Sequence, residues 1–438
     1  MANNYNRRLK ANEDGIVRGQ IFDRNGEILA VTKVNDGISN RSYPYKRLYS
    51  HIIGYNSDIY GKTLLEAQFN DTLLGINALG LIGNTVSLVT GEAKTGNSLN
   101  LTIDHKLQSK AHDLMGKNRG AIVAVNPKTG EILAMVSTPD FNPNESSLKE
   151  NWADISTNEN SPLLPRAVLG LYPPGSTFKV VTAISAIENG LIDFKVNDSG
   201  SVIIDGKTFS NYSNQEHGEI NMTTAMAVSS NVYFSMLSEV LNSKKLINTS
   251  ENSGINKNIS FDIPINKSSI ENSIKSKTEL AATAIGQGKL LVTPLQMALI
   301  SSGIANDGVI MKPYLVKSVS DKNDNILSST ISKKMYNFTD SKTAQIVKEM
   351  MIEVVKNGTG REAAISNVIV AGKTGTAQNE KSSQGEGNDH AWFIGFAPAY
   401  DPEIAIAVII ENQEKGGGQI AAPIARKIMS EWIKNGKK

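Results

Sequence analysis

Ser176-Thr177-Phe178-Lys179, directly after Pro173-Pro174-Gly175, is the stretch from which the fold of this sequence can first be read. The two prolines and the glycine end the preceding segment and let the backbone turn, so that a new helix opens at Ser176. Apolar residues then recur at helical spacing until Asn189-Gly190, whose turn-forming residues end the pattern. The stretch therefore predicts a helix with a serine at its start and a lysine one turn later.

Ser176 and Lys179 have the arrangement of a nucleophile and its base. Free N–H groups and the dipole at a helix N-terminus favour negative charge at the Ser176 position. Lys179 lies on the same face, one turn on, within reach of the hydroxyl. The alternative is an N-cap serine followed by a surface lysine, and the apolar neighbours of Lys179 weigh against it.

Two further motifs follow in the chain, Ser229-Ser230-Asn231 and Lys373-Thr374-Gly375-Thr376. Ser229 and Asn231 lie within a helical stretch, residues 223–241, or on a break between two helices. Small polar residues among apolar ones are costly to bury unpaired, although a helix-capping pair is the structural alternative. Lys373 follows an apolar strand pattern at residues 368–371, and along a strand Thr374 and Thr376 face one side. Gly375 then permits close approach of another element.

Each motif also has copies elsewhere, so a single copy decides nothing. Ser-x-x-Lys recurs at Ser146, in a polar context without helical apolar spacing. Lys-Thr-Gly recurs at Lys128, in a hairpin turn, and at Lys94, in a linker-like stretch. Ser-x-Asn recurs at Ser156 and at Ser250. We expect all of these copies to be structural.

The bulk composition limits the classes of function. The chain has 438 residues, 40% hydrophobic and 20% charged residues, a net charge of +2 and no cysteine. This length favours two domains, and the absence of long blocks of like charge argues against a nucleic-acid partner. Without cysteine there is no thiol nucleophile, disulfide or thiolate metal site. No stretch reaches the roughly 18 apolar residues of a membrane span. We therefore expect a soluble chain, the outer part of a protein whose membrane anchor is absent from this sequence.

The order of predicted elements indicates an α+β fold in two domains, residues 1–95 and 96–438. The first is rich in short strands, including a hairpin around Asn25-Gly26 and one helical piece near residues 64–74. The second begins with a strand at residues 99–103, a helix capped by Asp104 and a hairpin at residues 120–137. A helical middle runs from about residue 176 to residue 304. Strands return at residues 368–371, 390–397 and 404–410, before a last helix at residues 421–434. We expect the outer halves to meet in one sheet.

Over nearly its whole length the chain resembles the class B penicillin-binding proteins, the peptidoglycan D,D-transpeptidases, and within them the compact subgroup. The three motifs occur in the family's order, and four secondary signatures match, at residues 18–26, 172–176, 286–298 and 392–398. The resemblance implies an antiparallel sheet covered by helices, an all-helical subdomain and a smaller N-terminal β-rich pedestal or dimerisation-like domain. It also implies that β-lactams inhibit the protein covalently.

The resemblance also assigns roles to individual residues. Ser176 would be the nucleophile and Lys179 its base, with a pKa lowered by burial and by Lys373. Ser229 would relay a proton to the departing D-Ala, and Asn231 would hold the acyl donor's backbone. The backbone N–H groups of Ser176 and Thr376 would stabilise the oxyanion. The terminal carboxylate would be bound by the third motif, Lys373, Thr374, Gly375 and Thr376.

No cofactor or metal is implied. The expected partners are peptidoglycan stem peptides, β-lactam antibiotics and a polytopic glycosyltransferase in the membrane. The expected location is the outer face of the bacterial cytoplasmic membrane, held by an N-terminal helix absent from this sequence. A serine β-lactamase or β-lactam sensor, a D,D-carboxypeptidase and a catalytically silent scaffold remain as alternatives. His390 is expected to be structural or to border the cleft, and residues 380–389 to form a flexible hairpin tip near it.

Overall fold

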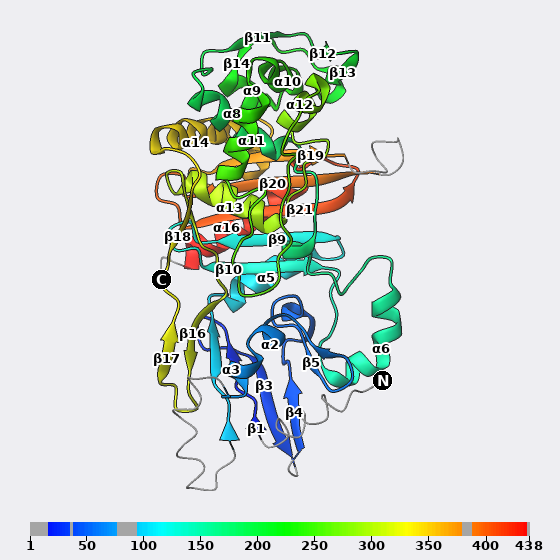
Figure 1. Ribbon diagram of the computed structural model, residues 1–438, viewed down its shortest axis with the longest axis vertical. Helices are drawn as coiled ribbons and strands as arrows, with labels where there is room; N and C mark the ends of the chain where they lie inside the picture. The colour runs from blue at the N-terminus through cyan, green and yellow to red at the C-terminus, as the bar shows by residue number, and fades with distance from the viewer. Residues whose placement is uncertain (1–15, 36–37, 77–93, 379–387, 436–438) are drawn as a thin grey trace.

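The computed structural model describes residues 16–35, 38–76, 94–378 and 388–435, and Figure 1 shows three tiers along its long axis. The N-terminal strands form one end. A five-stranded sheet lies in the middle, and most of the helices between residues 179 and 284 form the other end. The predicted α+β architecture is confirmed.

The middle tier is an antiparallel sheet in the order β10-β9-β21-β20-β19. Its strands come from the two ends of the segment that follows residue 96, so the expectation that these ends meet in one sheet is correct. The strands are β9 (Gly120–Val125), β10 (Ile132–Thr138), β19 (Ala371–Ala377), β20 (Asp389–Ala397) and β21 (Ile404–Gln413). β19 forms one edge and carries the whole third motif. The expected strand at residues 368–371 thus begins only at its last residue, because Val368 and Ile365 close a tight turn before it.

Helices cover both faces of this sheet, because its strands are apolar on both sides. Along β9, Ile122 and Ala124 belong to one cluster of buried residues, whereas Ala121 and Val123 belong to another. The first cluster includes α5 (His105–Met115) and α16 (Ala421–Asn435), and the second includes α8 (Lys179–Glu188) and α13 (Pro294–Ala305). Asp104 caps α5 as predicted, since its side chain accepts from Leu107 N at 2.9 Å. The sheet therefore lies at the centre of the core, between two layers of helices.

The helical tier also contains strands that we did not predict. Its helices are α8, α9 (Met222–Val228), α10 (Asn231–Val240), α11 (Ser243–Asn252) and α12 (Lys277–Ala284), with α14 (Ser341–Lys356) packed beside them. Two small sheets lie among them, β11 (Lys195–Asp198) with β14 (Gly218–Asn221) and β12 (Ser201–Ile204) with β13 (Lys207–Ser210). Asp205-Gly206 forms the β12–β13 turn with φ of 45° and 79°. This two-residue hairpin signal is visible in the sequence and was missed.

The N-terminal tier is a six-stranded sheet in the order β17-β16-β8-β2-β3-β4. Its strands are β2 (Ile21–Phe22), β3 (Ile28–Asn35), β4 (Ile38–Ser42), β8 (Ser98–Leu101), β16 (Val316–Ser320) and β17 (Ile326–Ser329). The hairpin around Asn25-Gly26 is confirmed as β2 and β3, and the helical piece near residues 64–74 as α2 (Leu64–Gln68) and α3 (Asn70–Leu73). Half of the strands in this sheet follow residue 95. The division of the chain into two domains at residue 95 therefore stays a proposal.

Short elements complete the described chain. They are β1 (Ile16–Val17), η1 (Lys46–Tyr49), β5 (Asn56–Ser57), β6 (Gly61–Lys62), β7 (Lys94–Thr95), α6 (Glu145–Thr157), α7 (Arg166–Leu169), η2 (Gly175–Phe178), η3 (Tyr212–Asn214), β15 (Val309–Met311), β18 (Lys334–Asn337) and η4 (Arg361–Ala363).

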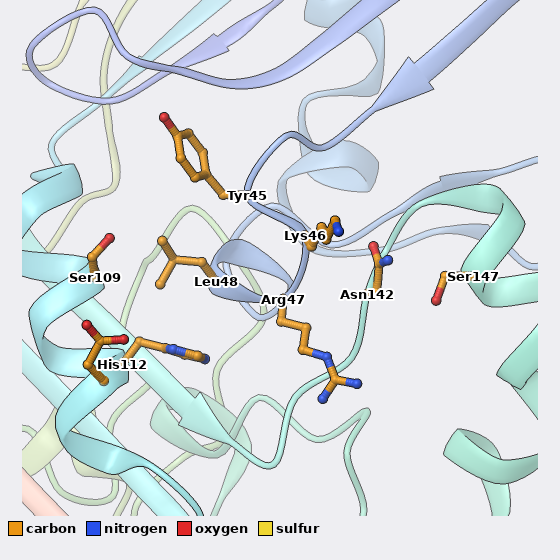
Figure 2. A pocket seen from close by; sticks show the side chains of 9 residues that line it. Tyr45, Lys46, Arg47, Leu48, Ser109, His112, Asn142 and Ser147 are labelled. Atoms are coloured by element: carbon orange, nitrogen blue, oxygen red, sulfur yellow. The ribbon is translucent and has the colours of Figure 1, made fainter.

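A surface hollow of about 490 Å³ marks the junction between the N-terminal tier and α5, as Figure 2 shows. Tyr45 and Arg47 line it from η1 and its start, and His112 lines it from α5. His112 Nε2 lies 2.6 Å from the Asp140 carboxylate, and Arg47 lies 3.6 Å from it. The hydrogen bond that the His112 ring donates to Asp140 raises the pKa of His112 above its ordinary value. Because Arg47 and His112 both pair with Asp140, we interpret the hollow as a structural feature of the junction between the tiers.

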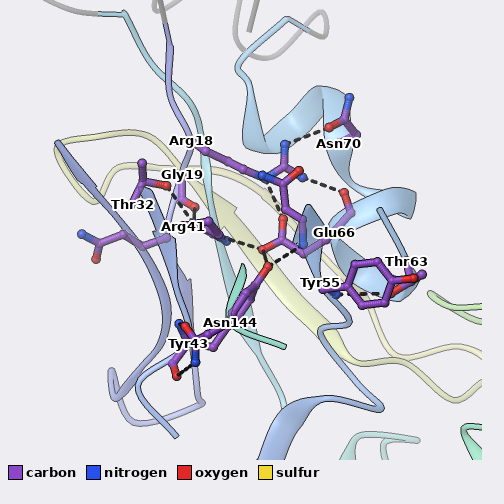
Figure 3. A network of polar contacts seen from close by, with 12 residues as sticks. Arg18, Gly19, Thr32, Arg41, Tyr43, Tyr55, Thr63, Glu66, Asn70 and Asn144 are labelled. Carbon is purple, nitrogen blue, oxygen red and sulfur yellow. Dashed lines mark hydrogen bonds and ion pairs between the residues drawn. The ribbon is translucent and has the colours of Figure 1, made fainter. Parts of the chain in front are cut away.

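A buried ion cluster fastens the N-terminal sheet to α2, as Figure 3 shows. Glu66 is fully buried and lies 2.6 Å from Arg18 Nε and 2.7 Å from Arg41 Nε. Tyr43 Oη donates to the same carboxylate at 3.1 Å. Burial alone would raise the pKa of Glu66, but Arg41 and Arg18 outweigh burial and hold it below the usual value. Removing one partner from such a cluster would leave a buried charge without a counter-charge, which is costly. The cluster therefore fixes the geometry of this tier.

Candidate active site

The predicted nucleophile lies where η2 passes between β19 and the turn at Gly286. Gly175 N donates to Gly286 O at 2.9 Å, and Gly175 has a φ of +54°. A Cβ on Gly175 would lie 2.5 Å from Thr376 O, so only glycine allows this approach to β19. Trp392 Nε1 also donates to Pro173 O at 3.1 Å. Ser176 is therefore held in a short 3₁₀ turn against the edge strand, and α8 continues from it.

Of the two alternatives left open for the second motif, the structure shows the break: Ser229 is a left-handed residue between α9 and α10. Ser229 has φ 64° and ψ 38°, which costs a non-glycine residue roughly 1–2 kcal/mol. The turn directs the carbonyl and the hydroxyl of Ser229 toward Lys179. Lys179 Nζ, which is fully buried, donates to Ser229 O at 2.7 Å and to Asn231 Oδ1 at 2.8 Å. Its distance to Ser229 Oγ is longer, 3.4 Å.

The third motif lies on the edge strand β19. Lys373 is fully buried, and its Nζ donates to Ser229 Oγ at 2.8 Å and to Thr374 O at 3.0 Å. A Cβ on Gly375 would meet the Thr177 methyl group at 2.9 Å, so the predicted close approach at Gly375 is to η2. Thr376 is exposed, whereas Thr374 is 6% exposed. Thr374 Oγ1 lies 2.6 Å from Thr359 Oγ1.

The two buried lysines lose affinity for protons. Burial lowers the pKa of Lys179 well below its ordinary value, and the nearby charge of Lys373 lowers it further, while Asp198 raises it. Burial lowers the pKa of Lys373 to about 7. Two ammonium groups that share the Ser229 hydroxyl repel each other and are poorly solvated, so the neutral form of Lys179 is favoured.

The structure thus brings all three motifs to one place. Lys179, Ser229, Asn231 and Lys373 form one hydrogen-bonded cluster, and the Ser176 turn packs on Gly375 and Thr376 of the same motif as Lys373. In the described part of the chain, Ser176 Oγ has no hydrogen-bond partner, and Ser176 is only partly buried. Its hydroxyl therefore remains available to a substrate.

The motif copies lie elsewhere. Ser146 and Lys149 belong to α6, where Lys149 pairs with Glu145 at 3.4 Å. Ser156 belongs to α6 as well, and Ser250 lies in α11 with its hydroxyl donated to Leu246 O. Lys94-Thr95 is the short strand β7, and residues 128–130 form the β9–β10 turn with Gly130 at φ 83°. All are structural, as expected.

Two further predictions concern the neighbourhood of the cleft. His390 lies in β20, is buried, and accepts from Asn412 N at 3.3 Å. Burial lowers its pKa below the ordinary value, which favours the structural alternative. The predicted hairpin tip at residues 380–389 falls mostly on residues 379–387, which lie outside the described residues.

Sequence reasoning missed several residues that contact the motifs. Asp198 and Asn211 hold the turn at Ser230, and Thr359 contacts Thr374. A Cβ on Gly417 would lie 1.9 Å from Trp392 O and 2.5 Å from Gly375 O, so the loop after β21 packs onto the edge strand. The three glycines at residues 416–418 were a signal of this close approach. Asp198 and Asn211 had none, because each is one polar residue among turn formers.

Nothing among the described residues indicates a metal site or a membrane span. No group of three or more His, Asp or Glu residues in this part of the chain is arranged to hold a metal ion. Within the same residues, no helix combines the length and the apolar character that crossing a bilayer requires.

Comparison with known proteins agrees with this geometry. The model of the penicillin-binding protein transpeptidase domain matches residues 120–430, and that of the penicillin-binding protein A dimerisation domain matches residues 18–99. The peptidoglycan D,D-transpeptidase PbpA of Mycolicibacterium smegmatis is 32% identical, over 98% of this chain and 92% of its own length. MrdA of Acinetobacter baumannii is 33% identical, over 91% of this chain and 66% of its own length, so this chain spans just under two thirds of MrdA.

Solved structures agree as well. The imipenem acyl-enzyme complex of penicillin-binding protein A from M. tuberculosis superposes with a TM-score of 0.91 at 29% identity, covering 96% of this chain and 99% of that one. The D,D-transpeptidase domain of a peptidoglycan glycosyltransferase from Eggerthella lenta gives a TM-score of 0.86 at 33% identity, with the same coverage. The family-model matches take in most of the chain, and the relatives extend over nearly all of it. The chain therefore belongs to the penicillin-binding proteins, among the class B peptidoglycan transpeptidases.

Proposed function

We propose that this protein crosslinks peptidoglycan as a D,D-transpeptidase, through an ester formed on Ser176. The observation that carries the proposal is the cluster in which Lys179, Ser229, Asn231 and Lys373 share hydrogen bonds beside the Ser176 turn. The cluster supplies a base, a proton relay and a cation within one buried site. Its geometry supports the roles that we propose below for the individual residues.

Lys179 is the base that takes the proton of Ser176. A neutral amine has two N–H donors and one lone pair, whereas an ammonium has three donors and no acceptor. The two short bonds of Lys179, to Ser229 O and Asn231 Oδ1, use both donors of the neutral form. The lone pair then remains for the Ser176 proton. The lowered pKa of Lys179 favours this neutral form.

The backbone N–H groups of Ser176 and Thr376 stabilise the oxyanion of the tetrahedral intermediate. The Thr376 carbonyl faces Gly175, beyond the free edge of β19. In a strand the N–H and C=O of one residue point to the same side, so the Thr376 N–H also faces the Ser176 turn. Removing one such donor typically costs about 3–4 kcal/mol of transition-state stabilisation.

The remaining residues bind the donor peptide and move the second proton. Ser229 Oγ accepts from Lys373 and can pass its own proton to the amine of the departing D-Ala. Asn231 Nδ2 uses one hydrogen on Ser210 O at 2.7 Å, and its other hydrogen holds the acyl donor's backbone. Lys373, with the Thr374 and Thr376 hydroxyls, binds the terminal carboxylate along β19, where charge-assisted bonds are strong.

The reaction closes when the amine of a second stem peptide attacks the ester. The C–Oγ bond breaks, an amide forms, and the proton of the amine returns to Ser176. A β-lactam acylates Ser176 in the same way, but its leaving group stays attached, so the acyl-enzyme persists. The substrate lies outside the cytoplasm, so we place the domain at the outer face of the cytoplasmic membrane. There an N-terminal helix is the proposed anchor, and a polytopic glycosyltransferase is the proposed partner.

Labelling with a fluorescent penicillin tests the nucleophile. We expect one stoichiometric label on the protein, none on Ser176→Ala, and full labelling of Ser146→Ala, which alters the motif copy on α6. A label retained by Ser176→Ala would refute the assignment.

Product analysis separates transpeptidation from the alternatives. A peptide ending in D-Ala-D-Ala is incubated with an amine acceptor and followed by mass spectrometry. Crosslinked product supports the proposal, whereas release of D-Ala without it indicates a carboxypeptidase. Steady turnover of a chromogenic β-lactam, in place of a single burst, indicates a β-lactamase.

A further inference from the structure

One buried carboxylate next to the site has no part in the mechanism described so far. Asp198, at the end of β11, is 1% exposed. It accepts from Ser230 Oγ at 2.6 Å, from Gly200 N at 2.9 Å, and from Asn211 Nδ2 at 2.8 and 2.9 Å. All of these partners are donors. An ionised carboxylate satisfies them all, whereas an amide would turn an N–H group toward at least one of them.

Asn211 extends this contact to the start of α10. Its Oδ1 accepts from Asn231 N at 2.8 Å and from Val232 N at 3.2 Å. Ser230 Oγ, which donates to Asp198, also accepts from Tyr233 N at 2.9 Å. The first N–H groups of α10 are thus bound by a side chain that Asp198 orients. A helix start held from outside in this way cannot rotate without breaking several buried hydrogen bonds.

These contacts act on the residue that the base depends on. Ser229 lies directly before Ser230 in the left-handed conformation, which is unfavourable for a serine. Its carbonyl accepts one of the two short bonds of Lys179, and Asn231 accepts the other. Both acceptors of Lys179 therefore flank the residue that Asp198 holds. If the turn relaxed, Lys179 would lose the geometry that leaves its lone pair free.

Asp198 also has an electrostatic effect. The charged groups that act on Lys179 are Lys373, from β19, and Asp198, from β11, while the Phe234 ring of α10 lies 5.5 Å from its Nζ. Two buried lysines without a counter-charge would repel each other and resist every proton that the reaction returns to them. The Asp198 carboxylate, which binds the residues around Lys179, offsets part of this repulsion without accepting the proton itself.

We propose that Asp198 is a positioning residue of the acyl-transfer site, which holds the Ser229–Asn231 turn and supplies the counter-charge to Lys179. The proposal rests on the function proposed above, in which Lys179 is the base. It makes Asp198 act through its neighbours, since the structure shows no contact of its carboxylate with the Ser176 turn.

The test is the pH dependence of acylation. The second-order rate constant for labelling by a fluorescent penicillin is measured between pH 5 and 9 in the protein and in Asp198→Asn. In the protein the rate rises with pH as Lys179 loses its proton. Removing the counter-charge favours the neutral lysine, so the midpoint should move toward acid, by about one pH unit. The plateau should also fall. An unshifted midpoint, whether or not the plateau falls, overturns the proposal.

Two further variants keep the test decisive. Asp23→Asn is a matched control, because Asp23 is 2% exposed and accepts from the backbone N–H groups of Glu27 and His105, outside the cluster around Lys179. Its midpoint should not move. If Asp198→Asn does not fold, Ser230→Ala decides: it removes the hydrogen bond but keeps the charge, so the plateau should fall about tenfold at an unchanged midpoint. An undiminished plateau overturns the proposal. Failure of the proposed function would be seen separately, as a wild-type protein that takes no label at Ser176.

Discussion

Replacing Ser229 by alanine separates the chemistry of the site from its folding. The Ser229 hydroxyl accepts from Lys373 Nζ at 2.8 Å and lies 3.4 Å from Lys179 Nζ. Alanine keeps a Cβ, so the cost of the left-handed backbone, φ 64°, stays the same. What is lost is the hydroxyl that joins the two lysines, the proposed proton relay.

The expected magnitude follows from that contact. A hydrogen bond to a charged group contributes about 1.5–3 kcal/mol. If this bond is made in the transition state, its loss lowers the acylation rate constant by roughly 10- to 150-fold, since 1.4 kcal/mol is a factor of ten. The free energy of unfolding should change by less than about 1 kcal/mol, because Ser229 is only partly buried and Lys373 keeps its bond to Thr374 O.

The assay is stopped-flow or quenched labelling with a fluorescent penicillin, with urea unfolding measured in parallel. Ser161→Ala is a matched control, because Ser161 is another serine with positive φ, 49°, and it lies on the exposed surface. Its labelling rate should equal that of the unmodified protein. A Ser229→Ala rate within twofold of wild type, with Ser176→Ala unlabelled, would show that the hydroxyl carries no proton and would refute the relay.

Three other predictions concern the packing around the site and the N-terminal tier. Gly417→Ala should destabilise the protein by about 1–3 kcal/mol in urea unfolding, because its Cβ would lie 1.9 Å from Trp392 O; an unchanged midpoint of unfolding would contradict this packing. Glu66→Gln should cost about 3–5 kcal/mol, because it leaves two buried arginines without a counter-charge; a loss below 1 kcal/mol would show that the cluster is dispensable. The Asp140 carboxylate raises the pKa of His112 in the folded protein. The ion pair between the two therefore stabilises the fold fully at pH values below about 6.5, the pKa of His112 in the unfolded chain. This stabilisation is lost as the pH rises through the raised pKa of the folded state. The Tm should therefore fall over that interval, and Asp140→Asn should remove this fall; the same fall in Asp140→Asn would assign it to another group.

The site also shows how burial changes the proton affinity of the two lysines. Lys179 and Lys373 are both completely shielded from water, with relative exposures of 0%. In water both would be ammonium groups, and neither could accept a proton near neutral pH. The helical tier and the edge strand together remove that water, so the packing of two tiers lowers the pKa of Lys179, as the proposed base requires.

Local sequence was sufficient where neighbours along the chain decide the structure. The helix after Ser176, the Asp104 cap and the Asn25-Gly26 turn all rest on preferences that act within a few residues. The missed hairpin at Asp205-Gly206 was equally local, and its turn signal was available. The three motifs were recognisable for the same reason, because their residue types and order are properties of the chain itself.

Only the tertiary structure decided which polar residues meet. Ser-x-x-Lys and Lys-Thr-Gly each occur more than once, and the copies differ in where nonlocal packing places them. Lys373 reaches a hydroxyl 144 positions away, and Asp198 one 32 positions away. Thr374 and Thr376 share a face of β19, yet Thr359 covers only the first. Such contacts depend on how whole layers pack, and no preference of a single residue encodes them.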